Sequence, residues 1–403
     1  MMIRITQPWI EIHDGKSRCL CNIFVDDELR TIWFDTSEEY GDYLCIERGD
    51  AYLIGLLNWA MRRGDSIVSD IPITEELYYN ITVSLIPSLV KYSKGLHPID
   101  ITCKLAPAIT QGTAVGTGCS CGVDSFTTIY KHMDNEPFDE FSLTHLCINN
   151  VGAFAECYSE YGKEKTKTER YAISQAVAKE LSLPLIVTDS NFADVFEQDH
   201  LLSHTYSSVF AIYMLQKLWK KYYYSSSGHD YSEFSLIDND TKSAAFYELL
   251  SLQCFSTFGL RIYSDGGEMT RLEKTELIAD YSIAQKRLHV CLTRPYNCGK
   301  CDKCLRTLLT LDCIGKLESF SNVFDIEEYK RNREDAFLWL YKIHTMGDGI
   351  LEPVYEKMLN REDYLKVVTP LLEKDRKIYR KHTIKTSMKT LYKSVFLWNK
   401  KNE

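Results

Sequence analysis

Short apolar runs and longer amphipathic stretches alternate through the middle of the chain, from about residue 109 to residue 315. Short apolar runs favour buried strands, and apolar positions three and four residues apart favour helices. The expected strands are 144–149, 184–188, 260–263 and 289–292, and the expected helices are 124–131, 164–181, 205–219 and 271–279. This alternation predicts an α/β fold in which helices cover both faces of a parallel sheet.

The two ends of the chain follow other patterns. Before residue 109, short apolar segments separated by Asp-Gly and Asp-Asp turns predict strands, and helices are expected at 50–63 and 74–86. Pro87 should end or kink the second of these helices. From about residue 325 onward the pattern is helical. We therefore expect a smaller α+β domain at 1–108, the parallel-sheet domain at 109–320, and a helical region with a basic tail at 321–403.

Composition and charge exclude several classes of protein. The longest apolar stretch, 52–61, is too short for a bilayer span of about 20 residues, and the first residues do not follow a signal-peptide plan. The net charge is −9, although residues 374–403 alone carry ten Lys/Arg and two acidic residues, a net +8. The acidic remainder argues against nucleic-acid binding. The tail is either a solvated helix or a contact for RNA, anionic lipid or an acidic partner.

Four of the fourteen cysteines are clustered near residue 300. Two overlapping Cys-x-x-Cys steps let thiolates converge on one ion, and Zn²⁺ takes four such ligands in a tetrahedron. An iron–sulfur cluster is the alternative, and Cys313 is either a reserve ligand or a core cysteine. Clustering without a signal peptide indicates metal binding in the reducing cytoplasm. The expected zinc ligands are Cys291, Cys298, Cys301 and Cys304.

The segment from Gly118 to Phe126, Gly-Cys-Ser-Cys-Gly-Val-Asp-Ser-Phe, is a small-residue loop that leads into a helix. Backbone N–H groups and a helix N-terminus in such a loop attract anions. The hydroxyls of Ser120 and Ser125 would donate to phosphate oxygens, and the Asp124 carboxylate suits a phosphate-bridging Mg²⁺. No Gly-Lys-Ser/Thr follows, which excludes a Walker A loop. A plain helix cap is the alternative interpretation.

This loop resembles the Ser-Gly-Gly-x-Asp-Ser motif of the PP-loop (N-type ATP pyrophosphatase) superfamily, and the likeness covers about residues 109–315. Cys121 stands where the motif usually has a second glycine. The resemblance implies ATP and Mg²⁺ as cofactors and adenylation of a carboxylate, carbonyl or amide, with release of pyrophosphate. Ammonia, an amine or sulfur then displaces AMP. The residues implied to hold the nucleotide phosphates are Ser120, Cys121, Gly122, Val123, Asp124 and Ser125.

The cysteine cluster after this domain is similar to that of 7-cyano-7-deazaguanine synthase and its relatives. In that family the zinc is structural, and ATP drives conversion of a deazaguanine carboxylate to an amide and a nitrile; some relatives modify a protein instead. The chain also resembles PP-loop proteins that carry an additional N-terminal domain. The resemblance implies a small-molecule carboxylate or a protein acceptor as partner, and a homodimer is left open.

Further residues are expected near the nucleotide. Segment 265–275 resembles the family's late segment, in which a lysine opens a helix facing the phosphates, so Arg271 and Lys274 would neutralise transferred charge. A surface helix is the alternative. The resemblance also implies that adenine would lie beside Ile148 and Asn149, at the end of the second strand, and an ordinary turn after the strand is the alternative. Glu268 is a candidate general base.

Two other pairs of residues carry weaker signals. Asp189 and Ser190 end a strand and would either face the substrate or form an ordinary turn. His200 and His204 are four residues apart, and a metal pair, a ligand neighbour and a structural role are all consistent with that spacing.

The sequence thus predicts an AMP-forming, ATP-dependent ligase or amidating enzyme. Two alternatives remain. One is a tRNA sulfur transferase, which the acidic body disfavours. The other is a non-catalytic nucleotide-binding regulator or scaffold, in which Cys121 marks lost chemistry.

Overall fold

The computed structural model describes residues 1–133, 135–152, 163–226, 230–291 and 294–373. Its contacts divide the chain into two compact units, Met1–Ile326 and Glu327–Glu403. The basic tail at 374–403 lies outside the described residues.

The strands are β1 (Met2–Ile5), β2 (Trp9–His13), β3 (Lys16–Val25), β4 (Glu28–Ser37), β5 (Ser66–Ser69), β6 (Ile73–Thr74), β7 (Ile101–Thr102), β8 (Leu105–Ala106), β9 (Ala114–Gly118), β10 (His145–Asn150), β11 (Leu185–Ser190), β12 (Trp219–Ser225) and β13 (Arg261–Asp265). The helices are α1 (Asp50–Arg63), α2 (Glu75–Tyr79), α3 (Ile86–Lys91), α4 (Val123–His132), α5 (Lys163–Glu180), α6 (Phe192–Val195), α7 (His200–Met214), α8 (Glu248–Phe255), α9 (Arg271–Ile278), α10 (Ser282–Arg287), α11 (Asp302–Cys313), α12 (Ile326–Arg331), α13 (Arg333–Thr345) and α14 (Glu352–Met358). None of these helices combines the length and the apolar character needed to cross a membrane.

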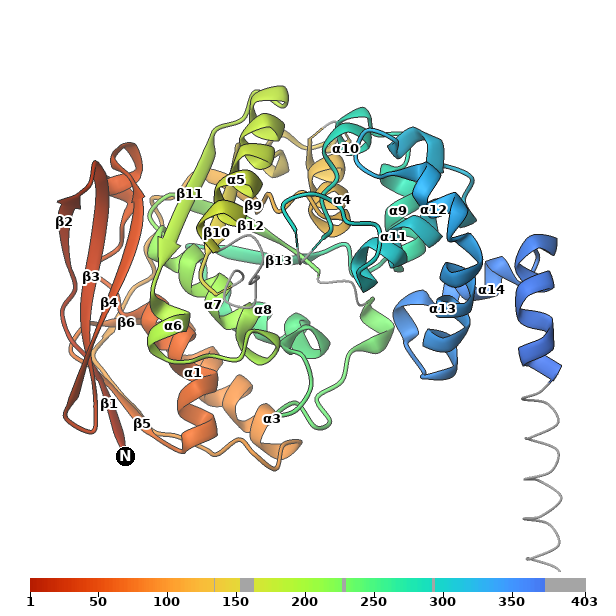
Figure 1. Ribbon diagram of the computed structural model, residues 1–403. Coiled ribbons are helices and arrows are strands. Elements are labelled where there is room, and N and C mark those ends of the chain that lie inside the picture. Colours follow the sequence, from red (N-terminus) through yellow and green to blue (C-terminus); the bar gives the residue numbers. More distant parts are fainter. Residues whose placement is uncertain (134, 153–162, 227–229, 292–293, 374–403) are drawn as a thin grey trace, which may run out of the picture. The chain divides into compact units, whose positions relative to one another are not determined.

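One mostly parallel sheet organises the first unit (Figure 1). Its strand order is β13-β12-β9-β10-β11-β4-β3-β1-β5-β7, with β2 paired to β3, and its first five strands are parallel to one another. Helices α4 and α5 lie on one face of these five strands, and α7 and α8 lie on the other. The expected α/β fold is therefore confirmed. The strand order reverses between β9 and β12, and open α/β sheets bind ligands at such a switch point.

The N-terminal segment extends this same sheet. β4 pairs with β11 in antiparallel fashion, at Asp35 opposite Asp189 and Phe34 opposite Ser190. On one face, α1 packs against α7, and the rings of Tyr52 and Phe210 lie 5.8 Å apart. One hydrophobic core runs across both segments. The boundary expected near residue 108 therefore does not coincide with a division of the structure.

Close packing at α1 depends on a glycine. A Cβ atom on Gly55 would lie 2.7 Å from Phe192 Cζ and 3.2 Å from Phe210 Cβ, so the aromatic rings occupy the space of a side chain. The helix ends at Gly64, whose φ of 69° is in the left-handed region that glycine favours. The predicted helix 50–63 is confirmed in type and in bounds.

The expected helix 205–219 is wrong at both ends. The chain enters α7 at His200, because the Asp199 carboxylate accepts from the backbone N–H groups of Leu201 and Leu202 and caps the helix. The helix ends at Met214, and the segment from Trp219 becomes β12. Aromatic residues favour strands, and here the sheet decides the outcome.

Two further expectations need correction. Residues 289–291 form no strand, because the N–H groups of Val290 and Cys291 bond to the Asn297 side-chain oxygen instead of to a neighbouring strand. The helix before Pro87 does not end there. It passes through a π-helical stretch, Asn80–Leu85, into α3, where Pro87 lies in the first turn and needs no N–H partner.

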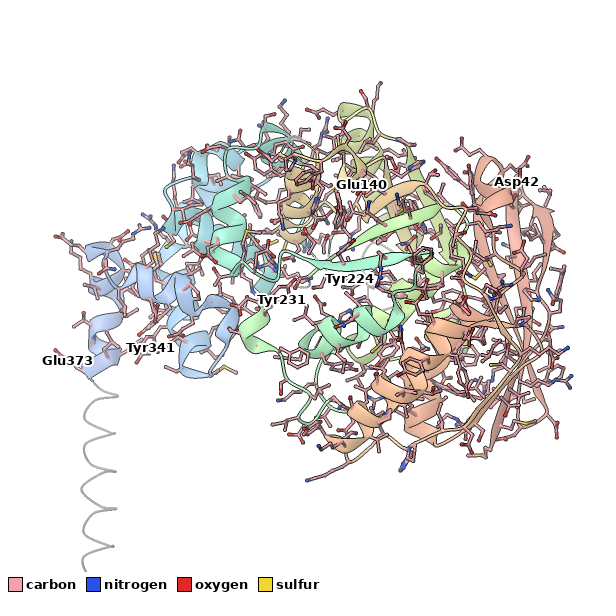
Figure 2. The ribbon with its side chains drawn as sticks, turned by 180° about the vertical axis from the view of Figure 1, so that it is seen from behind. Asp42, Glu140, Tyr224, Tyr231, Tyr341 and Glu373 are labelled. Atoms are coloured by element: carbon pink, nitrogen blue, oxygen red, sulfur yellow. The ribbon has the colours of Figure 1, made fainter. Side chains whose placement is uncertain are left out.

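The second unit is helical, as the pattern predicted, with α13, α14 and a helical stretch at 362–373. Tyr341, labelled in Figure 2, lies on α13 and is buried. The rings of Phe337 and Tyr364 lie 5.2 Å apart in its core.

Candidate functional site

The loop between β9 and α4 lies at the switch point of the sheet. Its turn is closed by Ser125, whose hydroxyl donates to the carbonyl of Gly118 at 2.7 Å. The N–H of Cys119 donates to the carbonyl of Cys147 at 2.7 Å and ties the loop to β10. The side-chain oxygen of Ser120 accepts from the N–H of Gly122 at 3.4 Å. These contacts direct the N-terminus of α4 into a pocket.

Cys121 adopts a backbone conformation that favours glycine. Its φ of 60° lies in the left-handed region, where a side chain is strained. The side chain is 1% exposed and points inward, with Sγ 3.6 Å from Ser174 Oγ and 3.9 Å from Cys119 Sγ. Cys121 therefore does not narrow the pocket in front of the loop.

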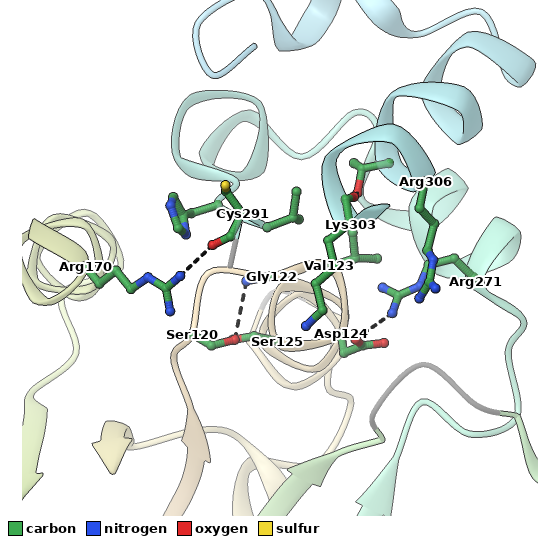
Figure 3. A pocket seen from close by; sticks show the side chains of 13 residues that line it. Ser120, Gly122, Val123, Asp124, Ser125, Arg170, Arg271, Cys291, Lys303 and Arg306 are labelled. Carbon is green, nitrogen blue, oxygen red and sulfur yellow. Dashed lines mark hydrogen bonds and ion pairs between the residues drawn. The ribbon is translucent and has the colours of Figure 1, made fainter. Parts of the chain in front are cut away.

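That pocket, here called the anion pocket, has a volume of about 160 Å³ (Figure 3). Its lining includes four cationic side chains and a single carboxylate, that of Asp124. Such an excess of positive charge in a concave site suits a polyanion. The lining consists of Ser120, Gly122, Val123, Asp124, Ser125, Arg170, Arg271, His289, Val290, Cys291, Lys303, Arg306 and Thr307.

Asp124 is held between two cations. Its carboxylate oxygens lie 3.0 Å from Arg271 Nη2 and 3.1 Å from Lys274 Nζ. Burial alone would raise the pKa of Asp124, but Arg271 and Lys274 outweigh it and lower this pKa to about 2. The carboxylate is therefore ionised throughout the physiological range.

Local sequence places both cations. Thr270 and Glu273 form a reciprocal capping box at the start of α9, in which each side chain satisfies the other's backbone N–H. Arg271 and Lys274 follow in the first turn and face α4. The structure thus brings together Asp124, Arg271 and Lys274, the three residues expected to carry the chemistry.

The structure adds cations that the sequence did not assign to the phosphates. Arg170, on α5, donates to the carbonyl of Cys291 at 2.5 Å at the edge of the anion pocket (Figure 3). Lys303 and Arg306 extend from α11. Burial and the nearby Arg271 charge lower the pKa of Lys303. The sequence did not assign Lys303 or Arg306 to the phosphates, and nothing distinguished Arg170 from other helical arginines.

A second cavity, the side pocket, adjoins the anion pocket and shares Ser120, Asp124, Ser125 and Arg170 with it. Its volume is about 340 Å³, and its walls are more apolar and aromatic. The two residues expected near adenine, Ile148 and Asn149, line it. The other lining residues are Gly118, Cys119, Cys147, Tyr171, Ser174, Ser208, Ile212, Tyr222, Tyr223, Tyr224 and Ser225.

A third cavity of about 300 Å³ lies between the N-terminal hairpin and the end of β11, and Tyr171 lines both it and the side pocket. Asp189 lines the third cavity, where it forms an ion pair with Lys167 and accepts from Asn150 at 2.6 Å. Ser190 is not among its lining residues. The Ser190 hydroxyl donates to the carbonyl of Trp33 at 2.6 Å, which is a structural contact.

The four clustered cysteines converge as expected, with their sulfur atoms all within 4.8 Å of one another. Cys291 and Cys301 are separated by 3.8 Å, and Cys298 and Cys304 by 3.9 Å. Sulfur atoms bound tetrahedrally at a zinc–sulfur distance of about 2.3 Å lie about 3.8 Å apart. The cluster could therefore hold a metal such as zinc. In the described part of the chain it is the one such group, and Cys313 is not part of it.

This cluster and the anion pocket share structural elements. Cys291 lines the anion pocket and also belongs to the cluster. Cys301 is the N-cap of α11, the helix that presents Lys303 and Arg306. The cysteines therefore position one wall of the anion pocket.

Two weaker candidates lie outside the three cavities. Glu268 forms an ion pair with Lys131 at 2.6 Å and is half exposed. His204 hydrogen-bonds through Nδ1 to the hydroxyl of Tyr224 (Figure 2), at 2.9 Å, and through Nε2 to Ser243 at 3.2 Å. These contacts indicate a structural role for His204.

Comparison with known proteins adds no family to this description. No family model matches the chain, and neither curated proteins nor solved structures include a match.

Proposed function

We propose that this protein is an AMP-forming, ATP-dependent ligase of the PP-loop type, which adenylates a carboxylate-class substrate and releases pyrophosphate. One observation carries the proposal. The loop with Ser120, Gly122, Asp124 and Ser125 opens, at the switch point of a parallel sheet, into a pocket with four cations and an adjoining half-apolar cavity. A polyanion attached to a flat, partly apolar group fits that pair of cavities.

In this proposal the anion pocket binds the phosphates and the side pocket binds the base. Arg170, Arg271, Lys303 and Arg306 would neutralise the phosphates, and charge that develops on the departing pyrophosphate would be stabilised by the same groups. Ile148 and Asn149 would contact the base in the side pocket. Mg²⁺, when bound, would supply further charge neutralisation, and the ionised Asp124 is the carboxylate available to it.

The metal expected at the cysteine cluster is zinc, in a structural role. All four ligands are protein thiols at separations that fit a closed tetrahedral site. A catalytic zinc keeps one position open, and four thiolates leave none.

The test uses the full-length protein, ATP labelled at the α-phosphate, Mg²⁺, and 7-carboxy-7-deazaguanine as one substrate. We expect AMP and pyrophosphate, and we expect Arg271→Ala to reduce their formation by about 100-fold, as for loss of one preorganised charge donor. Arg361→Ala is the matched control, because Arg361 also pairs with an aspartate, Asp363, but lies in the second unit. Formation of ADP and phosphate would contradict the proposal.

A second function is favoured by two specific observations. Asp124 is neutralised by two protein cations, and Cys121 is strained where the resembling motif has glycine. Both features suit a protein that binds the nucleotide without turning it over. ATP binding without AMP formation, across carboxylate substrates, would identify this regulator.

A further inference from the structure

Two cysteines flank Ser120 in the loop at the anion pocket. The sulfur atoms of Cys119 and Cys121 lie 3.9 Å apart and hydrogen-bond to each other. Residues two apart in sequence are separated by at most about 7 Å between Cα atoms. A disulfide accepts Cα separations of about 4.4–6.8 Å. That maximum leaves room for the separation a disulfide needs, and the 3.9 Å between the sulfur atoms shows that the two side chains point toward each other.

The pair is buried, yet one member faces a cavity. Cys119 lines the side pocket, which connects with the anion pocket through shared lining residues. A small oxidant in the side pocket therefore lies beside the loop residue Cys119, although the side chain of Cys119 is 0% exposed. Cys121 lies behind it, beside Ser174. The hydrogen bond between the two thiols lowers the pKa of Cys121 and, together with burial, raises the pKa of Cys119, so Cys121 is the member of the pair that favours the attacking thiolate.

We propose that Cys119 and Cys121 form a reversible oxidation site, at which a peroxide joins them in a disulfide and weakens anion binding at Ser120. The peroxide transfers one oxygen to one thiol and forms a sulfenic acid, and the other peroxide oxygen leaves as water or as an alcohol. The second thiol then attacks that sulfur, the sulfur–oxygen bond breaks, and water leaves with the remaining thiol proton. A dithiol reductant restores both thiols by exchange.

The effect on the loop follows from what anchors it. The sulfur atoms must approach from 3.9 Å to about 2.05 Å. The ends of the loop resist movement, because Cys119 is bonded through its N–H to Cys147 and through its carbonyl to Ser174. The carbonyl of Cys121 accepts from the N–H of His289 at 2.8 Å. Ser120, between the two cysteines, therefore takes up the change, and its hydroxyl and N–H lose their alignment with the pocket.

The first measurement concerns the bond itself and does not depend on the proposed function. Full-length, metal-loaded protein is titrated with hydrogen peroxide, and the remaining thiols are alkylated and mapped by mass spectrometry. We expect a disulfide that joins Cys119 to Cys121 at peroxide doses that leave the metal content unchanged, and we expect dithiothreitol to reverse it. Metal release before any such linkage would overturn the proposal, as would a linkage of Cys119 to Cys147 instead.

The second measurement concerns anion binding, with inorganic pyrophosphate and MgATP as probes. Oxidation should weaken the binding of both probes by about tenfold or more, because misalignment of Ser120 removes a hydrogen bond to a charged group. Cys121→Gly removes the thiol and suits the positive φ, so this variant should keep the same affinity before and after peroxide. Cys147→Ser should remain sensitive to peroxide, which controls for the second cysteine that lines the side pocket.

The outcomes separate the two proposals. If the reduced protein binds neither probe, the proposed ligase function fails while the mapped disulfide still stands. If the disulfide forms and the affinity for both probes is unchanged, the regulatory consequence is wrong. If Cys121→Gly loses affinity with peroxide as the unaltered protein does, the sensitive site lies elsewhere.

Discussion

At the scale of single residues, the chemistry depends on charges and small side chains whose surroundings alter their properties. Asp124 stays ionised because Arg271 and Lys274 overcome the effect of burial on its pKa. Two single residues illustrate this. Gly122 has no side chain and so leaves space in the anion pocket, and Glu248 places a carboxyl group in the buried interior.

Gly122 has no conformational need to be glycine. Its φ is −80°, and an added Cβ would lie 3.5 Å from Ser120 Oγ and 4.0 Å from the carbonyl oxygen of His289. Both neighbours line the anion pocket. We expect Gly122→Ala to keep or slightly raise the melting temperature and to weaken pyrophosphate binding by about tenfold, or about 1.4 kcal/mol. Calorimetry measures both quantities, and unchanged affinity would show that the phosphates do not approach this position.

Glu248 is a buried acid on α8, 3% exposed, whose Oε1 accepts from the Ser264 hydroxyl at 3.0 Å. Burial raises its pKa from 4.5 to about 7. A raised carboxyl pKa costs stability once the unfolded chain ionises, so the cost begins above about pH 4.5 and is complete above about pH 7. Glutamine keeps the acceptor and cannot ionise.

We therefore expect Glu248→Gln to match the unaltered protein at pH 4.5 and to be more stable at pH 8, by about 3 kcal/mol at most. Urea unfolding at a series of pH values measures this difference. Equal stability at all pH values would mean that Glu248 ionises normally in the folded protein.

At the scale of elements, two short helices assemble the anion pocket around α4. The capping box of α9 presents Arg271, and α11 presents Lys303 and Arg306. Cys301 is the N-cap of α11 and Cys304 lies in its first turn, so the cysteine cluster is joined to the pocket through this helix.

Loss of the metal should therefore weaken anion binding. We expect Cys298→Ser to lose the metal and to weaken MgATP binding by about tenfold or more. The reason is that the free energy of metal binding stabilises the fold of the segment that carries the ligands, which includes the start of α11. Cys313→Ser is the matched control, since Cys313 ends the same helix outside the cluster. Metal analysis measures the metal content of both variants, and calorimetry measures their affinity for MgATP. Normal MgATP affinity in metal-free protein would show that α11 keeps its place without the cluster.

At the scale of the whole molecule, the first 108 residues and the parallel strands β9 to β13 belong to one sheet and one hydrophobic core within the first unit. β4 covers the edge of β11, and α1 covers α7. An uncovered strand edge and helix face promote aggregation.

We expect a chain that begins at residue 109 to be insoluble or to lack cooperative unfolding. Circular dichroism and thermal unfolding of the truncated and complete chains test this. A truncated chain that unfolds cooperatively and keeps its MgATP affinity would show that the N-terminal segment is a separate domain after all.

The sequence alone determined the features that depend on near neighbours in the chain. Alternating short and amphipathic segments predicted the α/β fold, and the spacing of Cys298, Cys301 and Cys304 predicted their convergence. The bounds of α1 and α9 followed from their local periodicity and caps. These features are local, because hydrogen bonds within a helix and ligands a few residues apart need little from the rest of the fold.

Only the tertiary structure decided the features that join distant segments. The segment from Trp219 became β12 because it pairs with β9 and β13, and no local propensity excluded a helix there. Arg170 entered the anion pocket because α5 packs beside the segment of Cys291. The union of the N-terminal strands with the central sheet depends on the pairing of β4 with β11. Such contacts join residues from 40 to 156 positions apart, and periodicity within a short window carries no information about them.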